Sequence, residues 1–105
     1  ACGKKEEAGN QIQILVYDKE NNEIYNETFK TEEKFLGDAL AKQEDLEVVT
    51  EDSDYGPFIT SIKGLAQGDN YYWNYYVNGG YAEVGISQQE IKDGDVYTFK
   101  LEKFE

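Results

Sequence analysis

The stretch Tyr71-Tyr72-Trp73-Asn74-Tyr75-Tyr76-Val77-Asn78-Gly79-Gly80-Tyr81 decides how this chain folds, because it holds six aromatic side chains in eleven positions around an Asn-Gly pair. Aromatic and β-branched residues favour strands, and Asn-Gly is typical of a two-residue type I′ hairpin turn. The stretch therefore predicts a strand over residues 71–77 and a returning strand over 81–84. Side chains alternate between the two faces of a strand. Trp73 and Val77 mark the core face, so the other face carries Tyr72, Asn74, Tyr76 and Asn78.

A β-hairpin and one helix are predicted before this strand. Residues 11–17 alternate between polar and apolar side chains, and residues 23–30 read as the returning strand of a hairpin. Thr31 is placed to cap an amphipathic helix that runs to about residue 44. The apolar stripe of this helix consists of Phe35, Leu36, Ala39 and Leu40.

The carboxyl-terminal part is predicted to end in a central strand. Residues 58–65 read as extended, and Ser87-Gln88-Gln89-Glu90 has the capping-box pattern of a short helical turn near residue 88. Asp93-Gly94-Asp95 turns the chain into a last strand over residues 96–104. A hairpin, one helix and several strands that end in a central one form the β-grasp order. The predicted fold is therefore an α+β, β-grasp-like fold, with a twisted mixed sheet packed on one amphipathic helix.

Length and charge restrict the organisation and the partners of the chain. We expect one domain over residues 11–105 behind a tether of residues 1–10, because the first ten residues contain no β-branched or aromatic side chain. The net charge of −12 repels phosphate backbones and indicates that nucleic acid is not a partner. The chain has no His to act as a base and no phosphate loop or nucleophile elbow, so we expect no enzymatic activity.

Cys2 is the single cysteine of the chain and stands between Ala1 and Gly3, ahead of a polar run. A lone thiol forms no internal disulfide. A Cys between small residues and followed by a polar stretch resembles the cleavage site of bacterial lipoproteins, in which the Cys becomes the acylated first residue. We therefore expect Cys2 to be lipidated and the protein to be extracellular, with the lipid as its contact with the bacterial cell membrane. An incidental exposed Cys is the alternative.

Three motifs carry a resemblance to a known family. They are Tyr55-Gly56-Pro57-Phe58 with Ile59-Thr60-Ser61-Ile62-Lys63-Gly64, then Tyr72-Trp73 with Tyr75-Tyr76-Val77-Asn78-Gly79, and Gly85 with Lys92-Asp93-Gly94-Asp95. Over roughly residues 46–104 the chain resembles the transcobalamin-like C-terminal domain family, a β-grasp family of bacterial surface proteins and animal cobalamin carriers. In those carriers the domain covers one face of a corrinoid and a helical domain covers the other. The resemblance implies a binding or interaction module and a corrinoid as the cofactor.

The residues expected to contact a flat or ring-shaped ligand lie on the second face of the aromatic strand. Two tyrosines and two amides suit stacking on a ring and hydrogen bonding to its edge. The expected contact residues are Tyr55, Tyr72, Asn74, Tyr76, Asn78 and Tyr81. Cross-strand pairing of tyrosines that serves the sheet alone is the alternative.

Metal chemistry is restricted to a hard cation bound by oxygen, because the chain offers no His and only the terminal Cys. Acidic turns with spacing usable by Ca²⁺ contain Asp18, Glu20, Asn22, Asp52 and Asp54. Solvated turns are the alternative reading of both segments. A surface protein that binds a hard divalent cation through carboxylates is therefore a second functional hypothesis. A structural or adhesion module that binds a glycan or a protein through its tyrosines is the third.

Overall fold

A five-stranded mixed sheet forms one layer of the structure, a computed structural model that describes residues 9–103. Its strands lie in the order β2-β1-β8-β6-β7. Their bounds are β1 (Asn10–Tyr17), β2 (Glu23–Thr31), β6 (Tyr71–Val77), β7 (Gly80–Tyr81) and β8 (Val96–Lys103). The last strand, β8, is central, since it runs parallel to β1 and antiparallel to β6. This is the predicted β-grasp topology.

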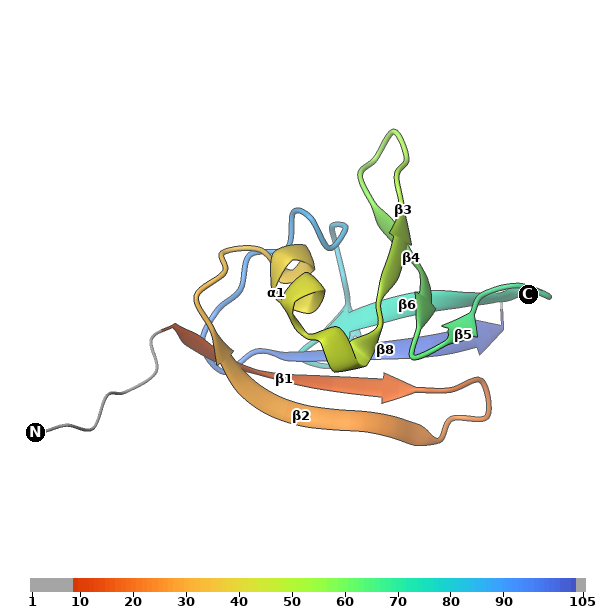
Figure 1. The fold of residues 1–105 in the computed structure, drawn as a ribbon, viewed down its shortest axis with the longest axis horizontal. Helices are drawn as coiled ribbons and strands as arrows, with labels where there is room; N and C mark the ends of the chain where they lie inside the picture. Colours follow the sequence, from red (N-terminus) through yellow and green to blue (C-terminus); the bar gives the residue numbers. More distant parts are fainter. Residues whose placement is uncertain (1–8, 104–105) are drawn as a thin grey trace, which may run out of the picture.

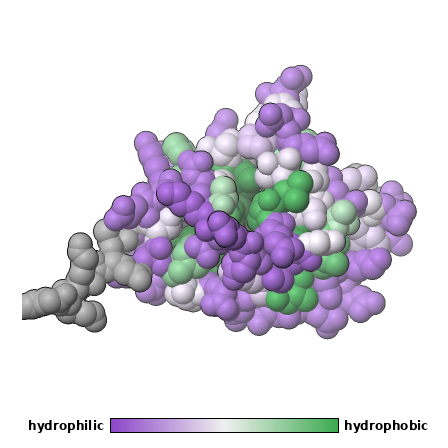
Figure 2. Space-filling model, in the orientation of Figure 1, coloured by the Kyte–Doolittle hydropathy of each residue, from purple (hydrophilic) through white to green (hydrophobic). Residues whose placement is uncertain are grey.

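The second layer covers one face of this sheet (Figure 1). It consists of α1 (Leu36–Lys42), the 3-10 helix η1 (Glu44–Leu46) and a small sheet of β3 (Val49–Glu51), β4 (Phe58–Ile62) and β5 (Leu65–Ala66). Figure 2 shows hydrophobic side chains at the surface between α1 and the β3–β4 hairpin. A hollow in this part of the surface is lined among others by Ala41, Val48, Pro57 and Ile86.

The core lies between the two layers and follows the predicted alternation. The inward side chains of β1 and β8 are buried, as are three of the apolar side chains predicted for the helix. These residues are Ile12, Ile14, Val16, Tyr97, Phe99, Leu101, Leu36, Ala39 and Leu40. The prediction of an α+β fold with a mixed sheet on one amphipathic helix is confirmed. No helix within residues 9–103 is both long enough and apolar enough to span a bilayer.

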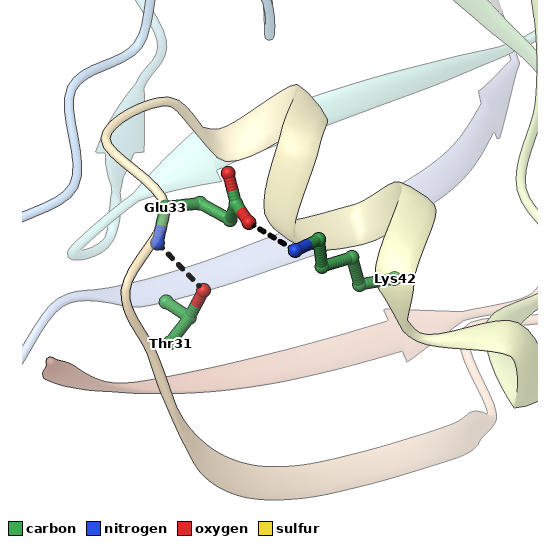
Figure 3. A network of polar contacts seen from close by, with 3 residues as sticks. All are labelled: Thr31, Glu33 and Lys42. Atoms are coloured by element: carbon green, nitrogen blue, oxygen red, sulfur yellow. Dashed lines mark hydrogen bonds and ion pairs between the residues drawn. The ribbon is translucent and has the colours of Figure 1, made fainter. Parts of the chain in front are cut away.

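The helix begins later than predicted. Thr31 still belongs to β2 and pairs with Asn10, and the first helical residue, Leu36, comes five positions later. Its Oγ1 instead accepts a hydrogen bond of 3.1 Å from the Glu33 amide, and Glu33 forms an ion pair of 2.6 Å with Lys42 (Figure 3). The N-cap position of α1 is Phe35, which provides no side-chain hydrogen bond. The prediction that Thr31 caps the helix is therefore wrong.

Three other predicted segments are shorter than expected. Residues 58–65 are not one strand, because Lys63 and Gly64 have positive φ angles of 51° and 80° and turn β4 into β5. The returning strand ends at Tyr81, after which the chain leaves the sheet. The turn near residue 88 is present as a single turn, closed by a 3.0 Å hydrogen bond from Gln88 N to Gly85 O. It does not continue as a helix, since Glu90 forms a β-bridge with Phe35.

Candidate functional site

The Asn-Gly turn has the predicted hairpin geometry and fixes the end of β6. Asn78 and Gly79 have φ angles of 52° and 89°, and Val77 pairs with Gly80 on either side of them. The side chain of Asn78, expected to contact a ligand, is used inside the fold. Its Nδ2 donates to Asp95 Oδ1 at 2.9 Å, and its Oδ1 accepts from the Val96 amide at 2.8 Å.

Asp95 is the buried polar centre of this end of the sheet. Its Oδ2 accepts hydrogen bonds from the Tyr97 hydroxyl at 2.6 Å and from the Lys92 amide at 3.0 Å. Burial acts to raise the pKa of Asp95, but the hydrogen bonds from Tyr97, Asn78 and the Lys92 amide outweigh it, so this pKa lies below its ordinary value. Asp95 therefore stays ionised and holds the turn before β8 to the β6–β7 hairpin.

Four of the six expected ligand residues lie on the uncovered face of the main sheet. Together with two residues of β8 they form a surface that we call the tyrosine platform: Tyr72, Asn74, Tyr76, Tyr81, Lys100 and Glu102. The Tyr81 side chain is 80% exposed, and its ring centroid lies 5.1 Å from that of Tyr76. Tyr55 does not join them, because it lies in the loop between β3 and β4, in the covering layer, where it is 91% exposed.

Polar contacts hold the tyrosine platform in one arrangement. Glu102 Oε1 accepts hydrogen bonds from the Tyr76 hydroxyl at 2.5 Å and from Asn74 Nδ2 at 3.1 Å. The ammonium of Lys100 lies 5.5 Å from the ring centroids of both Tyr76 and Tyr17. Burial, followed by the contact with Glu102, raises the pKa of Tyr76. Its hydroxyl therefore remains a proton donor to Glu102 at neutral pH.

An aromatic groove lies on the opposite, covered face, between β4 and the segment of residues 82–86. Its volume is about 390 Å³. The floor is formed by Trp73, Tyr75 and Phe99, and the walls by Pro57, Phe58, Ile59, Val84 and Ile86. Two residues of the tyrosine platform, Asn74 and Tyr81, also line the edge of the groove. This groove was not anticipated, because strand alternation assigns Trp73 and Tyr75 to the core and says nothing about what covers them. The apolar residues Phe58 and Val84, which lie beside Pro57 and Gly85, were the available signal.

The aromatic floor is held rigidly from both sides. Trp73 Nε1 donates to Leu65 O at 2.9 Å, which ties the floor to β5. The Tyr75 ring stacks on Phe99 with 5.5 Å between the centroids, and its hydroxyl donates to Val84 O. Burial raises the pKa of Tyr75 to about 12, so this hydroxyl keeps its proton. The Tyr75 hydrogen bond therefore anchors the segment that forms one wall of the groove.

The edge of β6 leaves two backbone groups open beside the groove. Ala82 N donates to Tyr75 O at 3.4 Å, and Trp73 N donates to Gln67 Oε1 at 3.3 Å. Between these contacts, the Tyr75 amide and the Trp73 carbonyl form no hydrogen bond with any residue from 9 to 103. One donor and one acceptor thus stand at the border of a mostly apolar groove.

The acidic residues predicted to bind Ca²⁺ neither line the groove nor belong to the tyrosine platform. Asp18 Oδ1 accepts hydrogen bonds from the amides of Glu20 at 2.9 Å and Asn22 at 2.8 Å, so it closes the β1–β2 turn. The hydrogen bond from the Asn22 amide lowers the pKa of Asp18. Asp52 and Asp54 lie in the exposed β3–β4 loop. Within the described part of the chain, no group of three or more His, Cys, Asp or Glu is placed to hold a metal ion. Cys2 lies outside the described residues.

Fold and surfaces together define a small β-grasp-like domain with an aromatic groove on one face of its sheet and a tyrosine platform on the other. The chain belongs to the DUF4430 family, a domain of unknown function, whose model matches residues 23–103. No curated protein matches the chain.

The chain matches several solved structures, two of which bear on its fold and function. The first is a candidate metal binding protein from Ruminococcus gnavus, with a TM-score of 0.83 and 26% identity, covering 91% of this chain and 99% of that chain. The second is haptocorrin in complex with Cbi, with a TM-score of 0.67 and 19% identity, covering 96% of this chain and 27% of haptocorrin. The likeness to haptocorrin shows the fold, and in that protein the fold makes up about a quarter of the chain.

Proposed function

We propose that this chain is a non-enzymatic binding module that receives a small flat ligand in the aromatic groove. The observation that carries the proposal is the groove itself, about 390 Å³ in volume, with an aromatic floor and two open backbone groups at its border. Small-molecule sites are typically concave, mostly apolar and provided with a few polar groups that orient the ligand. The groove combines these properties in one place.

The groove restricts the chemistry of the ligand. Rings that stack on Trp73 and Tyr75 must be flat, and an amide or similar edge group on the ring would accept from the Tyr75 amide and donate to the Trp73 carbonyl. Glu83 is the charged residue among those that line the groove, so a neutral or cationic ligand is favoured over an anion. A corrinoid meets these requirements, and the resemblance to the cobalamin carriers and the fold shared with the haptocorrin–Cbi complex support it.

An open groove on a domain of this size predicts weak binding. Only one side of the ligand is covered, so a small buried apolar area has to offset the loss of translational and rotational freedom on binding. We expect dissociation constants in the micromolar range or weaker, unless a second protein or domain closes over the ligand. Haptocorrin, in which the shared fold is about a quarter of the chain, supports such a completed site.

Amide chemical shifts test the proposal directly. The protein is titrated with cobinamide, cobalamin and heme, and we expect shifts centred on Trp73, Tyr75 and residues 82–86. Val84→Asp places a charge at the mouth of the groove and should weaken binding about tenfold or more. Val49→Asp is the matched control, because Val49 on β3 is 51% exposed, Val84 is 40% exposed, and Val49 does not line the groove. Shifts centred on Tyr72, Lys100 and Glu102, platform residues that do not line the groove, or equal effects of the two variants, would refute the groove as the site.

A hard divalent cation is the second candidate ligand. The similarity to the candidate metal binding protein from Ruminococcus gnavus favours it. Titration of the protein with Ca²⁺, followed by the same amide chemical shifts, tests cation binding. We expect shifts near Asp18, Glu20 and Asn22 or near Asp52 and Asp54.

The proposal includes a cellular location: the protein is extracellular and is attached to the bacterial cell membrane by a lipid. Cys2 with its small neighbours and the polar run behind it supports acylation at this residue. Mass spectrometry of the protein from its native membrane is expected to find an amino-terminal peptide that begins with acylated Cys2. An unmodified amino-terminal peptide that still carries Ala1 would rule out the lipid-anchored location.

A further inference from the structure

The tyrosine platform is a second surface, on the uncovered face of the sheet, and it borders the aromatic groove at Asn74 and Tyr81. The layer of α1 and β3–β5 lies over one face of the main sheet, and no helix or strand within residues 9–103 covers the other face (Figure 1). Tyr81 is 80% exposed although it stands beside Tyr76, whose own hydroxyl is already bonded to Glu102. An exposed ring held at a fixed tilt of 39° against a second ring is a preorganised apolar surface.

Polar groups beside these rings retain bonding capacity. The ammonium of Lys100 contacts the Tyr17 and Tyr76 rings but forms no hydrogen bond or ion pair with the residues described here. Asn74 uses its Nδ2 to contact Glu102, and its Oδ1 accepts no hydrogen bond from residues 9–103. Glu102 accepts both of its hydrogen bonds through Oε1, which leaves Oε2 as an acceptor. One donor group and two acceptor oxygens are therefore available within two neighbouring strands.

We propose that the tyrosine platform binds a neutral saccharide. A pyranose ring has one face of C–H groups that stacks on tyrosine and an edge of hydroxyls that both donate and accept hydrogen bonds. The platform offers the two complementary halves: the ring of Tyr81, and the polar group of Asn74, Lys100 and Glu102. A purely apolar ligand would remain half in water on this flat surface.

Charge selects a neutral saccharide over an anionic one. The platform contains one carboxylate, Glu102, and one ammonium, Lys100, and is neutral as a unit. The whole chain carries a net charge of −12, which disfavours the approach of polyanionic glycans and nucleic acids. The saccharide is thus expected to be an uncharged polymer or oligomer, bound through its ring faces.

The test uses cellohexaose, chitohexaose and mannohexaose as probes on the complete chain, followed by amide chemical shifts up to millimolar concentration. We expect shifts on β6, β7 and β8 with at least one probe. Tyr81→Ala removes the exposed ring and should weaken binding about fivefold or more, whereas Tyr81→Phe keeps the ring and should stay within about twofold. Tyr55→Ala is the matched control, because it removes another strongly exposed tyrosine, 91% against 80% for Tyr81, from the covering layer.

The proposal of a ligand in the groove and the proposal of a saccharide on the platform can be tested separately. Val84→Asp, which blocks the groove, should leave saccharide binding unchanged. Lys100→Gln, at a platform residue that does not line the groove, should weaken saccharide binding and leave binding in the groove unchanged. The saccharide proposal is overturned if none of the three probes shifts the platform, or if Tyr81→Ala binds as well as the unmodified protein. An equal loss in Tyr55→Ala would likewise overturn it, because the effect would not depend on the platform.

Discussion

Leu40→Ala is expected to lower the free energy of unfolding by about 2–5 kcal/mol, measured by chemical denaturation. Leu40 is buried between α1 and the main sheet, with Leu36 and Ala39 beside it in the same core. Its truncation removes apolar burial and leaves a cavity, because the sheet below cannot collapse into the space. In a domain of this size, the loss is a large share of the total stability.

Ala41→Ser on the exposed side of the same helix is the control, and it should cost roughly half a kcal/mol or less. A loss in Leu40→Ala as small as that of the control would mean that α1 does not pack on the sheet as described. The folding transition should remain cooperative in both variants, with an unchanged dependence on denaturant.

Asp95→Asn is expected to destabilise the protein by about 2–3 kcal/mol at neutral pH. The carboxylate accepts hydrogen bonds from Asn78, Tyr97 and the Lys92 amide at a buried position. An amide of the same shape has one oxygen to accept them and presents an N–H group where the second oxygen stood. Asp52→Asn, in the exposed β3–β4 loop, removes the same charge and should change stability by less than about half a kcal/mol.

The contribution of Asp95 has a defined pH dependence. Its pKa is lowered in the folded protein from the ordinary value of 3.8, so above that value the side chain is ionised in both states and its hydrogen bonds stabilise the fold fully. As the pH falls below 3.8, the unfolded state takes up the proton first, and the contribution is lost as the pH passes the folded-state pKa. The difference in unfolding free energy between the unmodified protein and Asp95→Asn should therefore be constant above about pH 5 and shrink below about pH 4.

A difference that stays the same down to the acid-unfolding range would show that Asp95 is not the group responsible. The comparison has to be made as a difference, since the chain contains 22 Asp and Glu residues whose titration also acts on the absolute stability.

The candidate site was predicted only in part from the sequence. Strand alternation correctly separated Tyr72, Asn74 and Tyr76 from Trp73, Tyr75 and Val77, because a period of two is a local property of the backbone. It did not show that Asn78 is committed to Asp95, a contact across 17 residues of sequence. Nor did it show the aromatic groove, whose walls come from β4 and from residues 82–86, two segments without regular alternation.

The sequence by itself determined the fold class, the central place of β8 and the hairpin at Asn78-Gly79. Each rests on a local rule: hydrophobic periodicity, the order of the elements and the positive φ angles that Asn and Gly tolerate. Tertiary structure decided the start of α1, because Phe35 forms a β-bridge with Glu90, and the Leu36 and Gly37 amides donate to Gln89 O and Ile86 O instead of to a capping side chain. It also decided the groove, because the covering layer and the hydrogen bond from Tyr75 to Val84 set how far the walls stand from the floor.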